Sequence, residues 1–300
     1  MKLEDEIKAL ASDKNAVILA HNYQPDEIQD IADYTGDSLE LARIAAGTKA
    51  DIIVFCGVHF MAESAVLLSP EKKVLLPDES AGCPMADMAT DADVAKMRKQ
   101  YPEAAVVTYI NSTAAVKALS DVCCTSSNAV KIVQRINADT ILFFPDKNLG
   151  SYVQRFTEKK IIPWKGFCPT HERFTPEELK RIKSDHPDAV VMVHPECRPE
   201  IIDLADEVQS TGGMVTFVKN TSHKKIIVGT EMGMIHRLKA EAPEKECILA
   251  SPGFICSNMK KITLEKLRDS LANEIPVISV KPDVAVKAKG CLQKMLELSY

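Results

Sequence analysis

The sequence lacks the features of several large classes of protein. No apolar run approaches the roughly 18 residues that a membrane-spanning helix needs; the longest strongly apolar stretch is 52–58, and His59 follows it. The N-terminus is acidic and has no apolar signal core, so we expect a cytoplasmic protein. The 300 residues include 37 Lys and Arg against 42 Asp and Glu, a net charge of −5. Without a basic excess, neither nucleic acid nor a membrane is expected as a partner.

The common signatures of nucleotide and zinc sites are also absent. The chain has no Walker A loop, no GxGxxG, no HExxH, no CxxC pair and no His-x3-His pair. It has no Gly/Ser-rich linker either, so we expect its domains to be fixed against each other. Apolar residues make up 46% of the chain and charged residues 26%, a composition that can bury a sizeable core.

What the sequence does contain is a pattern that occurs three times. A cysteine is followed seven residues later by a threonine that opens a helix-like segment, and then by a proline and a β-rich run. The three pairs are Cys83 with Thr90, Cys168 with Thr175 and Cys256 with Thr263. The period is 85 residues and then 88. Strands that alternate with helices at this spacing predict βαβ units and parallel sheets.

The segments between these landmarks keep the same order. Predicted helices lie at 3–10, 91–100, 176–185 and 264–273. Predicted first strands lie at 16–20, 106–110 and 190–193, with one more strand expected at 277–280. Predicted second strands lie at 51–56, 140–144 and 225–228. Predicted third strands lie at 73–76, 160–162 and 247–250, each running into a cysteine loop. Thr175 and Glu178 form a capping box around Pro176, which marks a helix start.

The repeat predicts both the fold class and the domains. We expect an α/β fold of three pseudo-symmetric, three-layer αβα domains with small parallel sheets, packed around a shared axis. The first domain is expected at 1–98, the second at 99–184 and the third at 185–274. The remaining residues, 275–300, are expected to pack back on the first domain.

Polar side chains follow the first strand of each repeat. They are His21, Asn22 and Tyr23, then Tyr109, Asn111 and Ser112, then His194 and Glu196. Ligands bind beyond the carboxyl ends of parallel strands. Three polar clusters at matching positions of the repeat therefore favour one common site. The alternative is that each polar side chain only forms hydrogen bonds near its own strand end. Polar turns at Ser38, Ser126 and Thr211 come just before helices. Free N–H groups there can bind anions, or the side chains can serve only as helix caps.

Nine cysteines in a reducing compartment also need an explanation. Cys83, Cys168 and Cys256 each lie on a glycine-marked loop at a strand end, so the three thiols can converge at the axis. Three soft thiolates fit an iron–sulfur cluster with one iron left open as a Lewis acid, and the alternative is three buried free thiols. The remaining cysteines lack this register: Cys56, Cys123, Cys124, Cys197, Cys247 and Cys291.

Short motifs along nearly the whole chain are specific in combination. They include AHNYQ at 20–24, GDSL at 36–39, FMAE at 60–63, CPMA at 83–86, YINST at 109–113, TSSNAV at 125–130, PDKNL at 145–149, HPEC at 194–197, GTEMGM at 229–234 and NMK at 258–260. With these motifs the chain resembles the A-type quinolinate synthase family of NAD biosynthesis.

The resemblance implies an activity, a cofactor and a set of site residues. It implies condensation of iminosuccinate with dihydroxyacetone phosphate to quinolinate, phosphate and water, with an iminosuccinate-producing enzyme as an upstream partner. It also implies a central [4Fe–4S] cluster held by Cys83, Cys168 and Cys256. The catalytic residues that it implies are His21, Tyr23, Tyr109, His194 and Glu196. The substrate contacts that it implies are His21, Ser38, Tyr109, Ile110, Asn111, Ser126, His194, Pro195, Glu196, Ser210 and Thr211.

One position departs from part of the family. Some members have a second cysteine three residues after the last cluster ligand, where this chain has Met259. We therefore expect no redox-active pair at that place. The alternatives to the synthase are an iron–sulfur electron carrier, a hydratase-type lyase acting on a small dicarboxylate, a zinc hydrolase and a metal-free binding protein.

Overall fold

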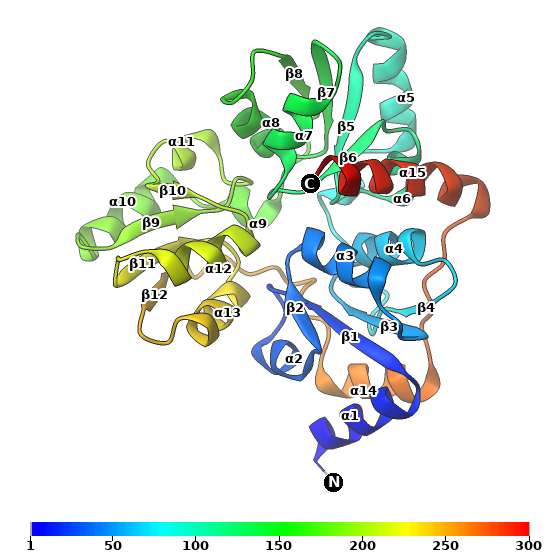
Figure 1. Ribbon diagram of the computed structural model, residues 1–300. Helices are drawn as coiled ribbons and strands as arrows, with labels where there is room; N and C mark the ends of the chain where they lie inside the picture. The colour runs from blue at the N-terminus through cyan, green and yellow to red at the C-terminus, as the bar shows by residue number, and fades with distance from the viewer. Residues whose placement is uncertain (1, 300) are drawn as a thin grey trace.

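The structure, a computed structural model, describes residues 2–299 and contains three four-stranded, wholly parallel sheets around a common centre (Figure 1). The first sheet contains β1 (Ala16–His21), β2 (Tyr34–Gly36), β3 (Ile52–Cys56) and β4 (Lys73–Leu75). The second contains β5 (Ala105–Tyr109), β6 (Val122–Cys124), β7 (Thr140–Phe144) and β8 (Lys160–Pro163). The third contains β9 (Val190–Val193), β10 (Glu207–Val208), β11 (Lys225–Gly229) and β12 (Glu246–Leu249).

The strand order is the same in every sheet: β2-β1-β3-β4, β6-β5-β7-β8 and β10-β9-β11-β12. In each unit the second strand is added on one side of the first strand, and the third and fourth strands are added on its other side. The order of the strands therefore reverses between the first and third strands. In open parallel sheets such a reversal opens a crevice at the carboxyl ends of the strands, where ligands bind. This topology confirms the predicted fold class of three small αβα units.

The helices cover the sheets, and seven of the fifteen in the described part of the chain begin with a side chain that caps the first turn. They are α1 (Leu3–Asp13), α2 (Asp26–Ile31), α3 (Ser38–Gly47), α4 (His59–Leu68), α5 (Asp91–Gln100), α6 (Ala114–Ala118), α7 (Ala129–Arg135), α8 (Lys147–Gln154), α9 (Pro169–Glu172), α10 (Pro176–Asp185), α11 (Pro199–Ile202), α12 (Thr211–Asn220), α13 (Gly233–Glu241), α14 (Leu264–Asn273) and α15 (Pro282–Leu298). A short 3-10 turn, Ala86–Met88, follows Cys83. None of the helices in residues 2–299 has the length and hydropathy needed to cross a membrane.

One hydrogen-bonded pair occurs at the same place in all three units. The carboxylate of Asp33 accepts the N–H of Ile18 at 2.8 Å, and the N–H of Asp33 donates to the carbonyl of Ile18 at 3.0 Å. The same pair recurs as Asp121 with Val106 and as Asp206 with Val191. Each pair ties the amino end of a first strand to the residue that begins the neighbouring edge strand.

The predicted elements agree closely with the structure in most places. Helices α5, α10 and α14 lie at the predicted residues, and Thr90, Thr175 and Thr263 cap them with their side chains. The Thr175–Glu178 capping box is confirmed by both of its reciprocal bonds. The edge strands β2, β6 and β10 were not predicted, because each has only two or three residues beside a polar turn.

The predicted strand at 277–280 is wrong. Only Val277 forms an isolated antiparallel bridge, with Leu75, and the N–H of Ile278 donates to the carbonyl of Val74. The segment therefore covers the edge of the first sheet without extending it as a parallel strand. Helix α15, which follows, packs mainly on α6 and β6 of the second unit and also on α4 of the first (Figure 1). Helix α15 thus contacts the second unit as well as the first.

Candidate active site

A cavity of about 190 Å³ lies where the carboxyl ends of the three sheets meet. Residues that follow the first strand of every unit line it, together with the three cysteine loops. Twelve of the predicted site residues line this cavity: His21, Tyr23, Ser38, Cys83, Tyr109, Asn111, Ser126, Cys168, His194, Glu196, Thr211 and Cys256. The sequence repeat therefore brings to one place side chains that are up to 235 residues apart.

Not every predicted contact lies there. Pro195 and Ser210 line a neighbouring outer hollow, and Ile110 borders a small apolar pocket. The side chain of Ser210 caps α12 by accepting the N–H of Gly213 at 3.1 Å.

The three cysteine loops are held in the same way by the backbone. The carbonyl of the residue two positions before each cysteine accepts a hydrogen bond from an amide N–H at the start of the helix that follows β3, β7 or β11; in the third unit the donor, Met232, directly precedes α13. These bonds join His59 to Ala81 at 2.8 Å, Lys147 to Gly166 at 2.7 Å and Met232 to Phe254 at 2.9 Å. The loops of Cys83, Cys168 and Cys256 thus leave their sheets with a common geometry.

The cysteine sulfurs are also alike in their surroundings. Each accepts a hydrogen bond from the backbone of the residue three positions later, namely Ala86, His171 and Met259. Burial nevertheless raises the pKa of all three thiols, that of Cys83 to about 12. The N–H bonds to the buried sulfurs favour the thiolate form, whereas burial disfavours it. The positive charge of a bound metal would stabilise the three thiolates in place of solvent.

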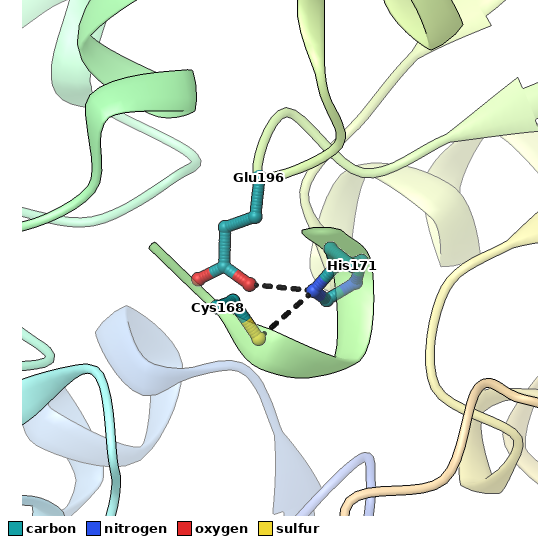
Figure 2. Close-up of side chains that lie close together, drawn as sticks. All are labelled: Cys168, His171 and Glu196. Atoms are coloured by element: carbon teal, nitrogen blue, oxygen red, sulfur yellow. Dashed lines mark hydrogen bonds and ion pairs between the residues drawn. The ribbon is translucent and has the colours of Figure 1, made fainter. Parts of the chain in front are cut away.

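The spacing of possible metal ligands separates two kinds of site. The ligand atoms of Cys168, His171 and Glu196 lie within 4.8 Å of one another, close enough for one ion (Figure 2). No other group of three such side chains within residues 2–299 meets that distance. Two sulfurs on one ion, at about 2.3 Å each, would lie less than about 4.6 Å apart. The sulfurs of Cys83, Cys168 and Cys256 do not all lie within 4.8 Å of one another, so these three thiols are not arranged as ligands of a single ion.

Two histidines occupy equivalent positions in the first and third units. The Nδ1 atom of His21 accepts the N–H of Tyr23 at 3.2 Å, and Nδ1 of His194 accepts the N–H of Glu196 at 3.3 Å. Burial lowers the pKa of His21 to about 4 and that of His194 to about 3, so both rings are neutral at pH 7. With Nδ1 occupied as an acceptor, the proton resides on Nε2, and each ring offers one neutral N–H donor.

Glu196 is the centre of the polar network. Its carboxylate accepts the Tyr109 hydroxyl at 2.7 Å and lies 2.9 Å from Nδ1 of His171 (Figure 2). Burial opposes ionisation of Glu196, but His194, His171 and the Tyr109 hydroxyl outweigh it and lower the pKa to about 2. Burial first, and then this neighbouring charge, raise the pKa of Tyr109 well above its usual value. The pair therefore combines a charged carboxylate with a protonated phenol.

A chain of hydrogen bonds connects Glu196 to Tyr23 on the other side of the cavity. The Tyr23 hydroxyl lies 2.6 Å from Oγ1 of Thr230, and Oγ1 of Thr230 lies 2.9 Å from Nε2 of His171. Burial raises the pKa of Tyr23 well above its usual value, and Glu196 adds to the effect. The sequence did not reveal His171 or Thr230 as site residues. Thr230 comes two residues after the predicted second strand of the third repeat, but His171 reaches the network only through tertiary packing.

Short polar side chains complete the wall. Ser38 and Thr211 are the first residues of α3 and α12, and Ser126 lies three residues before α7; the Ser126 hydroxyl lies 3.2 Å from Nε2 of His194. The buried Oδ1 atom of Asn111 has no hydrogen-bond partner among the described residues. Buried polar atoms are nearly always paired, so this one is placed to meet a ligand.

These features define an enzyme: three pseudo-equivalent α/β units enclose buried acid–base side chains and a set of converging thiols. A sequence model of the family described as "Quinolinate synthetase A protein" matches residues 5–297. The chain belongs to this family.

Relatives in distant organisms agree with this assignment. The chain is 54% identical over 296 residues to a protein named quinolinate synthase from Geobacter sp., with 99% of this chain and 97% of the relative covered. It is 53% identical to the proteins of that name from Methanoregula boonei, over 296 residues, and from Caldicellulosiruptor saccharolyticus, over 299 residues. Coverage is 99% of this chain in both, and 98% and 99% of the relatives.

Proposed function

We propose that this chain is a quinolinate synthase that condenses iminosuccinate with dihydroxyacetone phosphate, giving quinolinate, phosphate and water as a step of NAD biosynthesis. An enzyme that forms iminosuccinate then acts upstream. The observation that carries the proposal is the convergence of three equivalent cysteine loops and the Tyr23–Glu196 network on one cavity. Family membership over nearly the whole chain supports it.

Cys83, Cys168 and Cys256 would hold a [4Fe–4S] cluster. Their placement in three related loops, and their separation beyond that of ligands to one ion, support this assignment. When bound, the cluster supplies an iron without a cysteine ligand, which acts as a Lewis acid toward a leaving hydroxyl group.

Neutral donors on the opposite wall would bind the anionic groups of the substrates. Two carboxylates and a phosphate need several donors, and Ser38, Ser126 and Thr211 offer hydroxyls beside helix starts. The Nε2–H groups of His21 and His194 add directed donors. Because these rings stay neutral, they bind without drawing protons from the intermediates.

Tyr23 and Glu196 would move the protons. Glu196 is charged at neutral pH and can accept a proton, whereas the raised pKa of Tyr23 keeps a proton available for donation. Thr230 and His171 join the two groups, so the proton taken up on one side can be replaced on the other. Tyr109 and Asn111 orient the intermediate.

The unit boundaries also stay a proposal. We divide the chain at 1–98, 99–184 and 185–274. Residues 98 and 184 fall within α5 and α10, the helices that lead into the second and third sheets. Helix α5 packs on α6, and α10 packs on α11.

The proposal is tested first on protein purified without oxygen. We expect about four iron and four sulfide ions per chain, a brown colour that air bleaches, and quinolinate formation from the two substrates. The variant C168A should lose both iron and activity. C247A is the control, because Cys247 lies on β12 away from the cavity and its replacement should change neither.

Other outcomes would point to other functions. A zinc-loaded protein without sulfide would overturn the cluster and favour a single ion at Cys168, His171 and Glu196. An iron–sulfur protein whose spectrum does not respond to a substrate analogue would favour an electron carrier. Formation of another product from a small dicarboxylate would favour a hydratase-type lyase.

A further inference from the structure

Three equivalent positions behind the cysteine loops carry different side chains. The shared backbone bonds of the loops begin at His59, Lys147 and Met232. The residue just before each of these donors is Val58, Asp146 or Glu231. All three side chains are buried, with exposures of 3%, 0% and 0%. The repeat therefore places a carboxylate behind two of the loops and an aliphatic side chain behind the third.

Asp146 reaches the loop of Cys168 directly. Its Oδ2 atom accepts the N–H of Cys168 at 3.2 Å, and its Oδ1 atom accepts the N–H of Leu149 at 2.6 Å as the cap of α8. The backbone of Asp146 has φ +78°, a left-handed conformation that residues other than glycine rarely adopt. Such strain persists only where the surroundings impose it, and here it lets one carboxylate bind both amides.

Glu231 makes the corresponding contact in the third unit. Its Oε1 atom accepts the N–H of Cys256 at 3.1 Å. Its Oε2 atom accepts the N–H of Gly233 at 2.7 Å and an ammonium hydrogen of Lys260 at 3.0 Å. Lys260 also donates to the carbonyl of Tyr23 at 2.5 Å. The carboxylate thus connects the third cysteine loop to the backbone of a predicted catalytic residue.

Val58 has no hydrogen-bonding group to offer the loop of Cys83. Its side chain packs in the apolar core. This loop shares the backbone bond between His59 and Ala81 with its two counterparts, but it lacks their carboxylate contact. The three units therefore differ at this position: a carboxylate accepts the cysteine N–H in the second and third units, and no side chain does so from Val58 in the first.

We propose that Asp146 and Glu231 are positioning residues that fix the Cys168 and Cys256 loops around the metal cluster, leaving Cys83 as the least restrained ligand. The inference rests on the proposed function, in which the three thiols hold that cluster. Groups behind metal ligands orient them and commonly change metal affinity or activity by about 10- to 100-fold when they are removed.

Isosteric amides keep the shape of the side chains and remove the bond to the cysteine amide; E231Q also removes the charge that pairs with Lys260. In D146N, the amide oxygen can keep the cap on Leu149, so the amide NH2 faces the N–H of Cys168. In E231Q, the oxygen can keep Gly233 and Lys260, so the NH2 faces the N–H of Cys256. Two donors cannot pair, and each variant therefore loses one bond to a cysteine. D206N is the matched control, since Asp206 also accepts a backbone N–H but lies at the amino end of its strand.

The experiment compares the four reconstituted proteins without oxygen. Iron release to a chelator should be about tenfold faster in D146N and E231Q than in wild type and D206N. The EPR signal of the reduced cluster should shift in both variants, which a general loss of stability would not produce. Thermal unfolding of the metal-free proteins reports any folding defect separately.

The wild-type protein gives a second readout that no folding defect can affect. The holoenzyme is exposed briefly to air, and thiols released from the cluster are alkylated with iodoacetamide and identified by mass spectrometry. Cys83 should be modified first. Release of Cys168 or Cys256 before Cys83, or iron release and EPR signals in both variants that match wild type, would overturn the inference. A wild-type protein without any iron would instead overturn the proposed function.

Discussion

The two ends of the first strands differ in how closely the three units resemble one another. At the amino ends, Asp33, Asp121 and Asp206 make the same pair of hydrogen bonds in every unit. At the carboxyl ends, the residues that end or follow the strands are different: His21 and Tyr23, Tyr109 and Asn111, and His194 and Glu196. The frame, meaning the three sheets and the aspartate pairs that repeat in them, is therefore threefold. The side chains around the central cavity do not follow this symmetry.

This difference indicates what each end contributes. A repeated contact that faces no cavity serves the stability of its own unit. A substrate with distinct groups needs distinct partners, so the centre gains from side chains that break the symmetry. The two regions should consequently respond differently to mutation: changes at the centre should affect activity and metal binding, and changes at the amino ends should affect folding alone.

Replacing Glu196 should give the largest effect. E196Q keeps the size of the side chain but removes the charged acceptor that Tyr109 and His171 share. We expect kcat to fall by about 10²- to 10⁴-fold, the usual contribution of a general acid–base group. The measurement is quinolinate formation by reconstituted enzyme.

E241Q is the control for this change. Glu241 pairs with Lys219 and Arg237 on the outer helix α13, so its replacement should leave kcat within a few-fold of wild type. Wild-type turnover in E196Q would remove Glu196 from the chemistry.

The pH dependence of stability should also originate at the centre. Burial lowers the pKa of His21 to about 4 and that of His194 to about 3, against 6.5 in the unfolded chain. Between these values the unfolded chain binds more protons, so the free energy of unfolding falls as the pH decreases below about 6.5. Each histidine should make the metal-free protein about 2 kcal/mol less stable at pH 5 than at pH 8.

Urea unfolding of metal-free protein at pH 8 and pH 5 measures this difference. H21Q and H194Q should each reduce it, and H223Q, which changes an exposed side chain, should not. A difference that stays unchanged in both central variants would show that these rings titrate alike in the folded and unfolded chains.

The contrast between the two ends also explains what sequence reasoning could reach. The frame was predictable because caps such as Thr90 and Thr175, prolines and apolar strands are local signals that recur at a fixed period. Edge strands such as β10 were missed because two residues carry no periodicity. The strand expected at 277–280 failed because a β-branched run after Pro276 reads as a strand, although only Val277 finds a partner.

The centre was predictable only in part. The residues at the ends of the first strands occupy matching positions in the repeat, whereas His171 reaches Glu196 from the short helix α9 through tertiary contacts. Asp146 and Glu231 did carry a signal, since each comes two residues after a second strand of the repeat. Their roles depend on the cysteine loops packed against them, which no local pattern describes.

At the amino ends, the three aspartates should behave alike. D33A, D121A and D206A each leave a buried strand amide without its acceptor, at Ile18, Val106 and Val191. Such a loss costs about 1–3 kcal/mol of unfolding free energy. Denaturant unfolding should give similar values for all three, and iron content should match wild type. Loss of iron in any of them would contradict the separation of frame and centre.

The helix caps should give the smallest effects, and they allow the equivalence of the units to be tested quantitatively. Thr175 and Glu178 bond each other's backbone amides at 3.2 and 2.9 Å, so T175A should lose about 1 kcal/mol of unfolding free energy. Thr263 accepts only the N–H of Lys266, at 3.4 Å, and no acidic side chain returns the bond. T263A should therefore cost a few tenths of a kcal/mol. Denaturant unfolding of the metal-free variants measures both, and an equal cost would mean that the shorter bond of Thr175 to Glu178 stabilises its helix no more than the longer bond of Thr263 to Lys266.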